Sequence, residues 1–193
     1  MAIYLGPNSG TNISTSTAAW VKILKVTGGS TINDIAIDDL PTNTYRCLRF
    51  IGGLIPTTDN AHCNFYFRHN GGDEVSNTYS YGLRMNYESN NSYTNAEQNE
   101  GRMKLIENAG REQGEGHRLD LLIQMSNGSD TAQAADLGNF CMWHCQRIDA
   151  GGNWRGGTGT GWYDSGAHPN GFKIAMSSGQ ISDYNYAVYG LLA

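Results

Sequence analysis

The stretch GFKIAMSSGQISDYNYAVYGLLA, residues 171–193, decides the fold. In its first half, the large apolar residues Phe172, Ile174 and Met176 stand at every second position. After a Ser-Ser-Gly turn, residues 184–188 repeat the same alternation. A period of two is typical of a strand that buries one face and exposes the other. The segment therefore predicts that the chain ends inside a sheet rather than in a tail.

Strand-like runs of this kind recur along the whole chain. They cover residues 32–38, 45–51, 63–69, 79–87, 102–106, 117–125, 139–148, 172–176 and 184–192. The intervening segments, such as 88–101 and 149–161, are rich in Gly, Asn and Asp and are expected to be loops. Short strands at this spacing predict an all-β fold, either a β-sandwich or a barrel.

Residues 94–113 are the only segment with helix-forming composition. Gly101 and Gly110 inside it weaken the case for a helix. The pattern favours a loop followed by a strand through Met103 and Leu105.

The first thirty residues differ from the rest of the chain, because a polar stretch of small residues precedes the apolar run WVKILKV at 20–26. One interpretation is an N-terminal arm, residues 1–30, whose apolar residues Tyr4, Leu5 and Trp20 contact a neighbouring subunit rather than the same core. The other is an ordinary first strand of the sheet. Residues 31–193 are expected to form one β-sandwich domain, since a chain of this length is most simply a single domain.

Composition and charge exclude several classes of partner. The formal net charge is -5 and no run of Lys or Arg exists. A nucleic-acid partner is therefore not expected, since phosphate binding needs a basic stripe. The N-terminus has no basic region followed by an apolar stretch of signal-peptide length, and no segment approaches a membrane span. These features predict synthesis in a cytoplasm and no membrane contact.

The cysteines Cys47, Cys63, Cys141 and Cys145 invite a metal or disulfide interpretation, because CMWHC places Cys141 and Cys145 four residues apart. On a strand these two share a face but lie roughly 13 Å apart, too far for one zinc ion or a disulfide. We expect buried free thiols, no metal and no cofactor. No nucleophile elbow, zinc-protease helix or phosphate-binding loop is present either. The expectation is a protein without enzymatic activity, although carboxylates assembled from distant loops would leave no spacing signal.

The most conspicuous candidate site is residues 150–172, where Trp154, Trp162 and Tyr163 lie among glycines. Long loops in compact domains are often functional, and rigid aromatic side chains stack well on sugar rings or anchor protein contacts. These three residues are therefore the candidate receptor or saccharide contacts. The alternative is a further hairpin whose Trp side chains plug the end of the sandwich.

Residues 171–192, with a strand, a Ser-Ser-Gly turn and a last strand ending in Tyr-Gly-Leu-Leu, resemble the close of many tailed-bacteriophage virion proteins. Residues 40–75, with an apolar strand, a Pro-Thr-Thr-Asp turn and a Phe-rich strand closing on Asn-Gly-Gly, resemble the first half of the same proteins. Together with residues 79–87, the resemblance covers roughly positions 39 to 192. Residues 1–30 match nothing in this pattern, and residues 95–116 are more charged than it suggests.

The resemblance implies a jelly-roll-like antiparallel β-sandwich of about eight to ten strands on the outside of a phage particle, commonly as a homotrimer. Such modules serve as capsid decoration (cement) proteins bound to the major capsid protein, or as tail-fibre heads that touch the host. Because this chain reaches the sandwich without a long shaft, the sequence favours a decoration protein, assembled in the host bacterial cytoplasm and located on the virion surface. The alternative is a tail-fibre or receptor-binding tip that recognises host surface saccharide.

Overall fold

The computed structural model describes residues 20–41, 44–75, 78–87, 92–112, 114–125, 138–164 and 168–192. Within these ranges the chain contains strands and no helix. The strands are β1 (Trp20–Gly28), β2 (Asp34–Ile37), β3 (Tyr45–Pro56), β4 (Ala61–His69), β5 (Gly72–Asp73), β6 (Tyr79–Tyr87), β7 (Ser92–Glu100), β8 (Met103–Ala109), β9 (Gly116–Gln124), β10 (Asn139–Ile148), β11 (Trp154–Tyr163), β12 (Gly171–Met176) and β13 (Ile181–Leu192).

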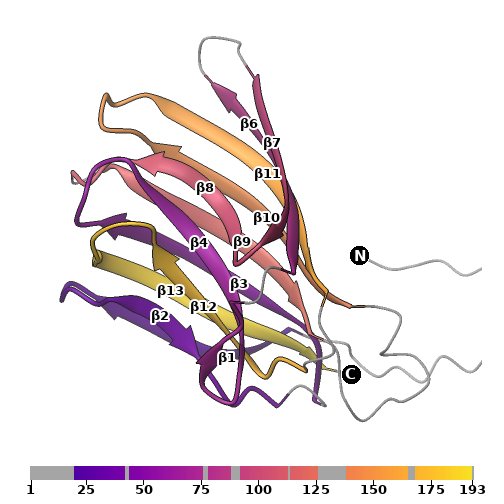
Figure 1. Cartoon of the computed structure of the whole chain (residues 1–193). Helices are drawn as coiled ribbons and strands as arrows, with labels where there is room; N and C mark the ends of the chain where they lie inside the picture. Colours follow the sequence, from indigo (N-terminus) through magenta and orange to yellow (C-terminus); the bar gives the residue numbers. More distant parts are fainter. Residues whose placement is uncertain are drawn as a thin grey trace, which may run out of the picture.

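The strands form two antiparallel sheets that pack as a sandwich (Figure 1). The larger sheet has 8 strands in the order β1-β13-β3-β9-β10-β11-β6-β7. The smaller sheet has 5 strands in the order β2-β12-β4-β5, with β8 also paired to β4. The predicted all-β class and the antiparallel sandwich are confirmed, and the barrel is excluded. The described strands exceed the expected number, because β5 and β7 were not predicted, and β1 and β11 were predicted only as alternatives, an ordinary first strand and a further hairpin.

The last strand lies in the interior of the larger sheet, as the pattern of residues 171–193 predicts. β13 pairs with β1 on one side and with β3 on the other. A Cβ atom at Gly190 would lie under 3.0 Å from the ring of Tyr45. Glycine is therefore required where this strand passes the Tyr45 ring.

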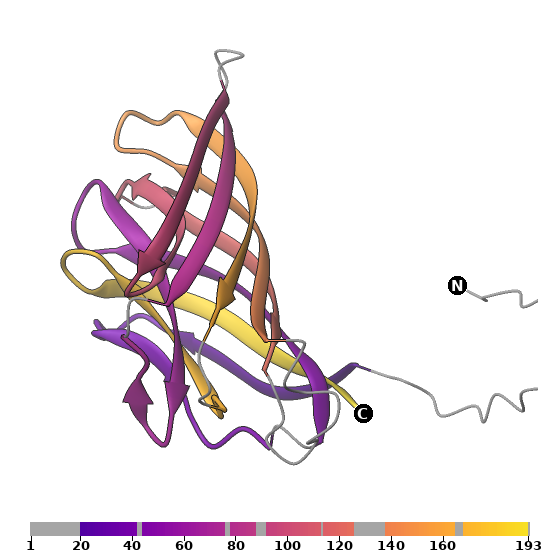
Figure 2. The ribbon, with the colours of Figure 1, turned by 45° about the vertical axis from the view of Figure 1, so that its right-hand side comes forward.

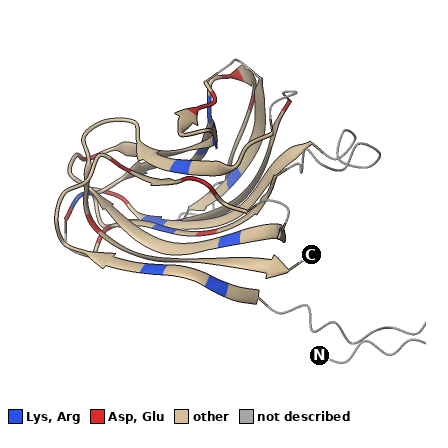
Figure 3. Cartoon of the chain, turned by 90° about the horizontal axis from the view of Figure 1, so that it is seen from below, with Lys and Arg blue, Asp and Glu red and all other residues tan. Residues whose placement is uncertain are grey.

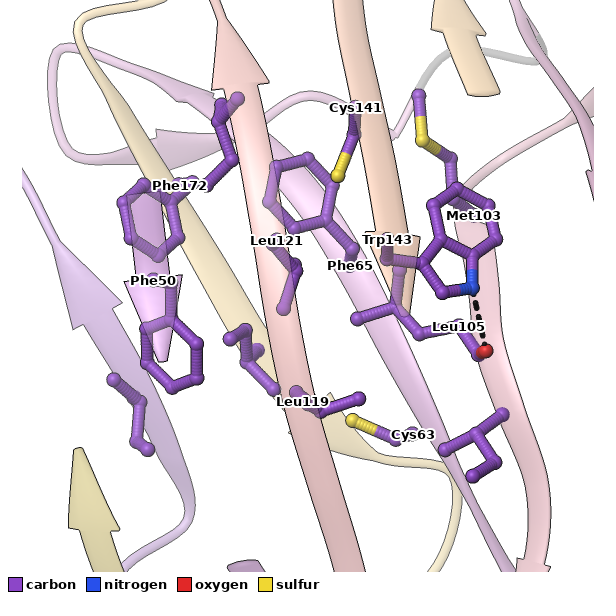
Figure 4. Close-up of a cluster of buried hydrophobic side chains, with 14 of the residues drawn as sticks. Phe50, Cys63, Phe65, Met103, Leu105, Leu119, Leu121, Cys141, Trp143 and Phe172 are labelled. Carbon is purple, nitrogen blue, oxygen red and sulfur yellow. Dashed lines mark hydrogen bonds between the residues drawn. The ribbon is translucent and has the colours of Figure 1, made fainter. Parts of the chain in front are cut away.

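The core fills the space between the two sheets, and aromatic rings form much of it (Figure 4). The ring of Phe172 on β12 stacks on Phe65 of β4 at 5.9 Å and meets Phe50 of β3 edge-on at 6.2 Å. Trp143 on β10 donates a hydrogen bond from Nε1 to the carbonyl oxygen of Leu105 on β8, at 2.8 Å. This buried bond joins the larger sheet to the smaller one.

β11 explains the unusual run GGTGTG. Gly157, Gly159 and Gly161 point into the sandwich, whereas Thr158 and Thr160 point out of it. A Cβ atom at Gly159 would lie under 3.0 Å from Cζ2 of Trp143, and one at Gly161 would meet the sulfur of Met103. The inward glycines therefore make room for large core side chains on β10 and β8.

Two segments expected to be irregular are strands. Residues 92–100 form β7, and 154–161 belong to β11, because sheet pairing outweighs the low strand propensity of Asn, Glu and Gly. The strand through Met103 and Leu105 is confirmed as β8.

At the N-terminus, residues 20–28 form β1, the edge of the larger sheet, so the described sandwich begins at Trp20 rather than at residue 31. Lys22, Lys25 and a register shift between Lys22 and Leu24 lie on this edge strand, features that discourage further strand pairing. Tyr4 and Leu5 lie outside the described residues.

Candidate functional site: the outer face of the larger sheet

The outer face is the side of the eight-stranded sheet that points away from the smaller sheet. Side chains alternate along each strand, so the neighbours of buried core residues share this face. It exposes an unusual set of large apolar side chains: Trp20, Ile51, Leu122, Phe140, Met142, Trp154 and Trp162. Exposed apolar groups that gather on one face commonly mark a binding surface.

A hollow of about 720 Å³ lies on this face, and we call it the trough. Its lining comes from β1, β3, β6, β7, β9, β10 and β11. Figure 2 shows how the long strands of the larger sheet bend along their length. The trough therefore depends on residues that are far apart in the sequence and are brought together by strand pairing.

A continuous polar row crosses the trough from strand to strand. Thr94 of β7, Arg84 of β6, Thr158 of β11, His144 of β10 and Asp120 of β9 stand directly opposite one another in register. Neighbouring strands lie about 4.8 Å apart, so the row spans roughly 19 Å. This row offers hydrogen-bonding groups at regular intervals.

An apolar row runs beside the polar one. Met142 of β10 and Leu122 of β9 pair in register, with Thr160 of β11 on one side and Arg49 of β3 on the other. Met142 is 54% exposed and Leu122 is 39% exposed. The trough is therefore amphipathic, with an apolar strip along a polar strip.

Asp120, at one end of the polar row, forms a bidentate ion pair with Arg49. Nε and Nη2 of Arg49 donate to Oδ1 and Oδ2 of Asp120 at 2.8 Å and 2.6 Å. These hydrogen bonds lower the pKa of Asp120 and raise the pKa of Arg49. Asp120 therefore stays ionised and oriented, which suits it to accept hydrogen bonds but not to supply a proton.

A second hollow, of about 450 Å³, lies at the end of the same face beside Trp154, and we call it the Trp154 hollow. Gly53 and Gly116 leave its floor without side chains, and Arg118, Gln146 and Asn185 also line it. Gly116 has a positive φ of 103°, and a Cβ there would lie under 3.0 Å from the carbonyl oxygen of Leu54. The backbone geometry at position 116 therefore requires glycine.

The three predicted aromatic contacts fall in three different places. Trp154 is 42% exposed and forms a wall of the Trp154 hollow. Trp162 is 45% exposed and stacks on Phe140 with ring centroids 6.3 Å apart. The two tryptophans are on the same face of β11, eight positions apart, or roughly 26 Å along the strand. The hairpin alternative is right about the strand, but neither Trp plugs the sandwich.

Tyr163 requires a correction, because it is fully buried. Its ring lies 4.6 Å from that of Tyr79, and its hydroxyl donates to Oε2 of Glu74 at 2.6 Å. The alternation that exposes Trp162 turns the next residue into the core, so Tyr163 offers no surface to a ligand. Trp20, the other described candidate, is 40% exposed and lines the trough.

The thiols are buried and unpaired. Cys63, Cys141 and Cys145 lie in the core, Cys47 is half-buried, and all four are free. Burial raises the pKa of the Cys145 thiol to about 12, which keeps it protonated and unreactive at neutral pH. Among the described residues, no three His, Cys, Asp or Glu side chains gather where they could hold a metal ion.

Sequence reasoning missed the polar row and the apolar strip. Met142, His144 and Asp120 each alternate with buried residues, which signals an outward position, but the sequence does not state which strands are neighbours.

Searches against known proteins add no relative: no family model, curated protein or solved structure matches this chain. No helix in the described ranges is long and apolar enough to cross a membrane.

Proposed function

We propose that the chain is a non-enzymatic surface protein of a bacteriophage particle that recognises host saccharide through the outer face of its larger sheet. The phage context rests on the resemblance of residues 39–192 to virion proteins. The observation that carries the binding role is the pair of hollows on one face, each flanked by an exposed tryptophan. Aromatic rings beside fixed polar groups fit the apolar faces and hydroxyls of sugars.

The carboxylate of the trough supports binding rather than glycoside hydrolysis there. A hydrolase acting in the trough would need two carboxyl groups flanking the scissile bond. Asp120 is the only carboxylate among the residues that line the trough, and Arg49 holds both of its oxygens. The trough is therefore better suited to holding a chain of sugars than to cutting it.

Capsid decoration is the second candidate, and one observation favours it. The stacked pair Phe140 and Trp162 lies at the opposite end of the outer face from the Trp154 hollow. A flat, exposed aromatic pair is the kind of anchor that protein interfaces bury. In this role, the partner is the major capsid protein, and a homotrimer of the chain would sit directly on the shell.

The two roles are separated by one pair of variants in two assays. Purified protein is tested on a glycan array and on capsids that lack the protein. The saccharide role predicts binding to the array that is lost with Trp154→Ala and kept with Trp162→Ala. The decoration role predicts binding to capsids that is lost with Trp162→Ala and kept with Trp154→Ala. A protein that binds neither the array nor capsids contradicts both roles.

A further inference from the structure

The outer face is basic although the protein is acidic. The net charge of the chain is -5. Yet the outward positions of the larger sheet hold the cations Lys22, Lys25, Arg49, Arg84 and Arg118 against the carboxylates Asp120 and Asp183. Figure 3 shows that charged positions are spread singly along the strands, with two basic positions on the edge strand β1. Strand pairing therefore brings these Lys and Arg residues onto one face, although they form no basic run in the sequence.

Two of these arginines have no ion-pair partner in the part of the chain that the structure describes. Arg49 is paired with Asp120, but among the ion pairs of the described residues none involves Arg84 or Arg118. Both side chains are exposed, and each lines a hollow: Arg84 the trough and Arg118 the Trp154 hollow. Each hollow thus contains an exposed guanidinium that has no ion-pair partner among the described residues, and the carboxylates Glu115 and Asp183 also line the Trp154 hollow.

The spacing of the two arginines fits a ligand that crosses the strands. Arg84 is on β6 and Arg118 on β9, three strands away in the sheet order. At about 4.8 Å per strand, they are separated by roughly 14 Å across the sheet. Thr158 and His144 of the polar row lie between them, on the strands in the middle. A ligand with negative charges repeated along an extended chain meets both guanidinium groups at once.

We infer that the saccharide bound by the outer face is an acidic polysaccharide, whose rings carry carboxylate or sulfate groups. This inference rests on the proposed function and names its ligand class. Arg84 and Arg118 bind the anionic groups through paired N–H donors, the geometry in which arginine recognises carboxylates. Met142, Leu122 and Trp154 contact the apolar faces of the rings. A nucleic acid fits less well, because the cations of this face stand singly and are interrupted by Asp120 and Asp183, whereas a dense line of phosphates needs a continuous basic stripe.

The test uses the full chain and measures equilibrium binding to four probes: alginate, a polymer of uronic acids; heparin, a sulfated polysaccharide; dextran, a neutral polysaccharide; and a thymidine oligonucleotide. We expect saturable binding to alginate or heparin that weakens as sodium chloride rises from about 0.05 M to 0.5 M, because salt screens the charges. Comparing alginate with heparin distinguishes carboxylate from sulfate as the group recognised.

The variants Arg84→Gln and Arg118→Gln each weaken acidic-polysaccharide binding about tenfold or more, since each removes a charged hydrogen-bonding group. Arg111→Gln is the matched control, because Arg111 is exposed, lines neither hollow and pairs with Asp59. All three positions are on the surface, so the urea midpoint of each variant stays near that of the unmodified protein and excludes unfolding as the cause.

Unchanged alginate and heparin binding in the double variant Arg84→Gln/Arg118→Gln overturns the inference. So does equal binding to dextran, which leaves the saccharide role of the outer face standing and removes only its preference for acid groups. Absence of binding to every polysaccharide, here and on the glycan array, overturns both the inference and the proposed function. Tight binding to the oligonucleotide alone overturns both as well.

Discussion

Replacing Gly159 by alanine tests how β11 packs against the core. The added Cβ atom would lie under 3.0 Å from Cζ2 of Trp143 and 2.8 Å from the carbonyl oxygen of Gly82. Non-bonded carbon atoms prefer about 3.5–4.0 Å, so the Trp143 ring or the β6 backbone has to move. Trp143 is buried, and the β6 backbone is paired with β11 on one side and β7 on the other, so neither can move freely.

The size of the effect follows from two opposing terms. Overpacking a well-filled core costs about 1–3 kcal/mol. Removing a glycine restricts the unfolded chain and returns about 0.4–1 kcal/mol. We therefore expect Gly159→Ala to lower the free energy of unfolding by about 1–2 kcal/mol. With a urea slope of about 2 kcal/mol per molar, the unfolding midpoint falls by about 0.5–1 M.

The matched control is Gly82→Ala on the neighbouring strand β6. A Cβ atom at Gly82 would have no heavy atom within 4 Å, so this variant is expected to be neutral or slightly more stable. The double variant Gly159→Ala/Trp143→Phe removes the obstructing ring atom and should lose less stability than the sum of its two single changes. If Gly159→Ala unfolds at the same urea concentration as Gly82→Ala, the packing described for β11 is wrong.

Further predictions concern the core, pH and assembly. His117 is fully buried, and loss of hydration, with Arg147 nearby, lowers its pKa to about 3. The unfolded chain therefore binds a proton at this residue near pH 6.5, whereas the folded chain does not. As pH falls from 6.5 towards 3, His117 lowers the free energy of unfolding by about 1.4 kcal/mol per pH unit. In urea titrations at several pH values, His117→Gln should flatten this slope; an unchanged slope would contradict the burial of His117. Trp143→Phe leaves the Leu105 carbonyl without its donor and should cost about 1–3 kcal/mol beyond the lost packing, as measured by urea unfolding; a cost below 1 kcal/mol would show that water replaces the bond. In light scattering, the purified protein should have about three times its chain mass of 21.1 kDa, and a clean monomer would count against the homotrimer.

The fold was largely predictable, because strands that bury one face leave a period of two in the sequence. Phe172, Ile174 and Met176 show it on β12, and all three are in the core. β7 was not predicted and β11 was predicted only as the hairpin alternative, since their residues are those of loops. In β11 glycine is required because large side chains of other strands, such as Trp143, fill the space beside it. The local sequence of β11 does not reveal these neighbours.

The site was predictable only in part, for a related reason. The exposure of Trp154 and Trp162 was predicted from the glycine-rich segment in which they lie. The structure places both on the outer face. The prediction for Tyr163 is wrong because it assumes a loop, in which consecutive aromatics can face the same way, whereas on a strand they alternate. The trough, and the separation of Arg84 from Arg118 across it, depend on the order β9-β10-β11-β6, which pairing over long sequence distances determines.

The most direct test of the outer face as the binding surface is methionine-methyl NMR of the full chain during titration with the saccharide that it binds best. Met142 is exposed in the trough, whereas Met103 and Met176 point into the core. The account predicts that the Met142 methyl signal shifts progressively to saturation while those of Met103 and Met176 stay in place. Saturable binding that leaves the Met142 signal unmoved would contradict it.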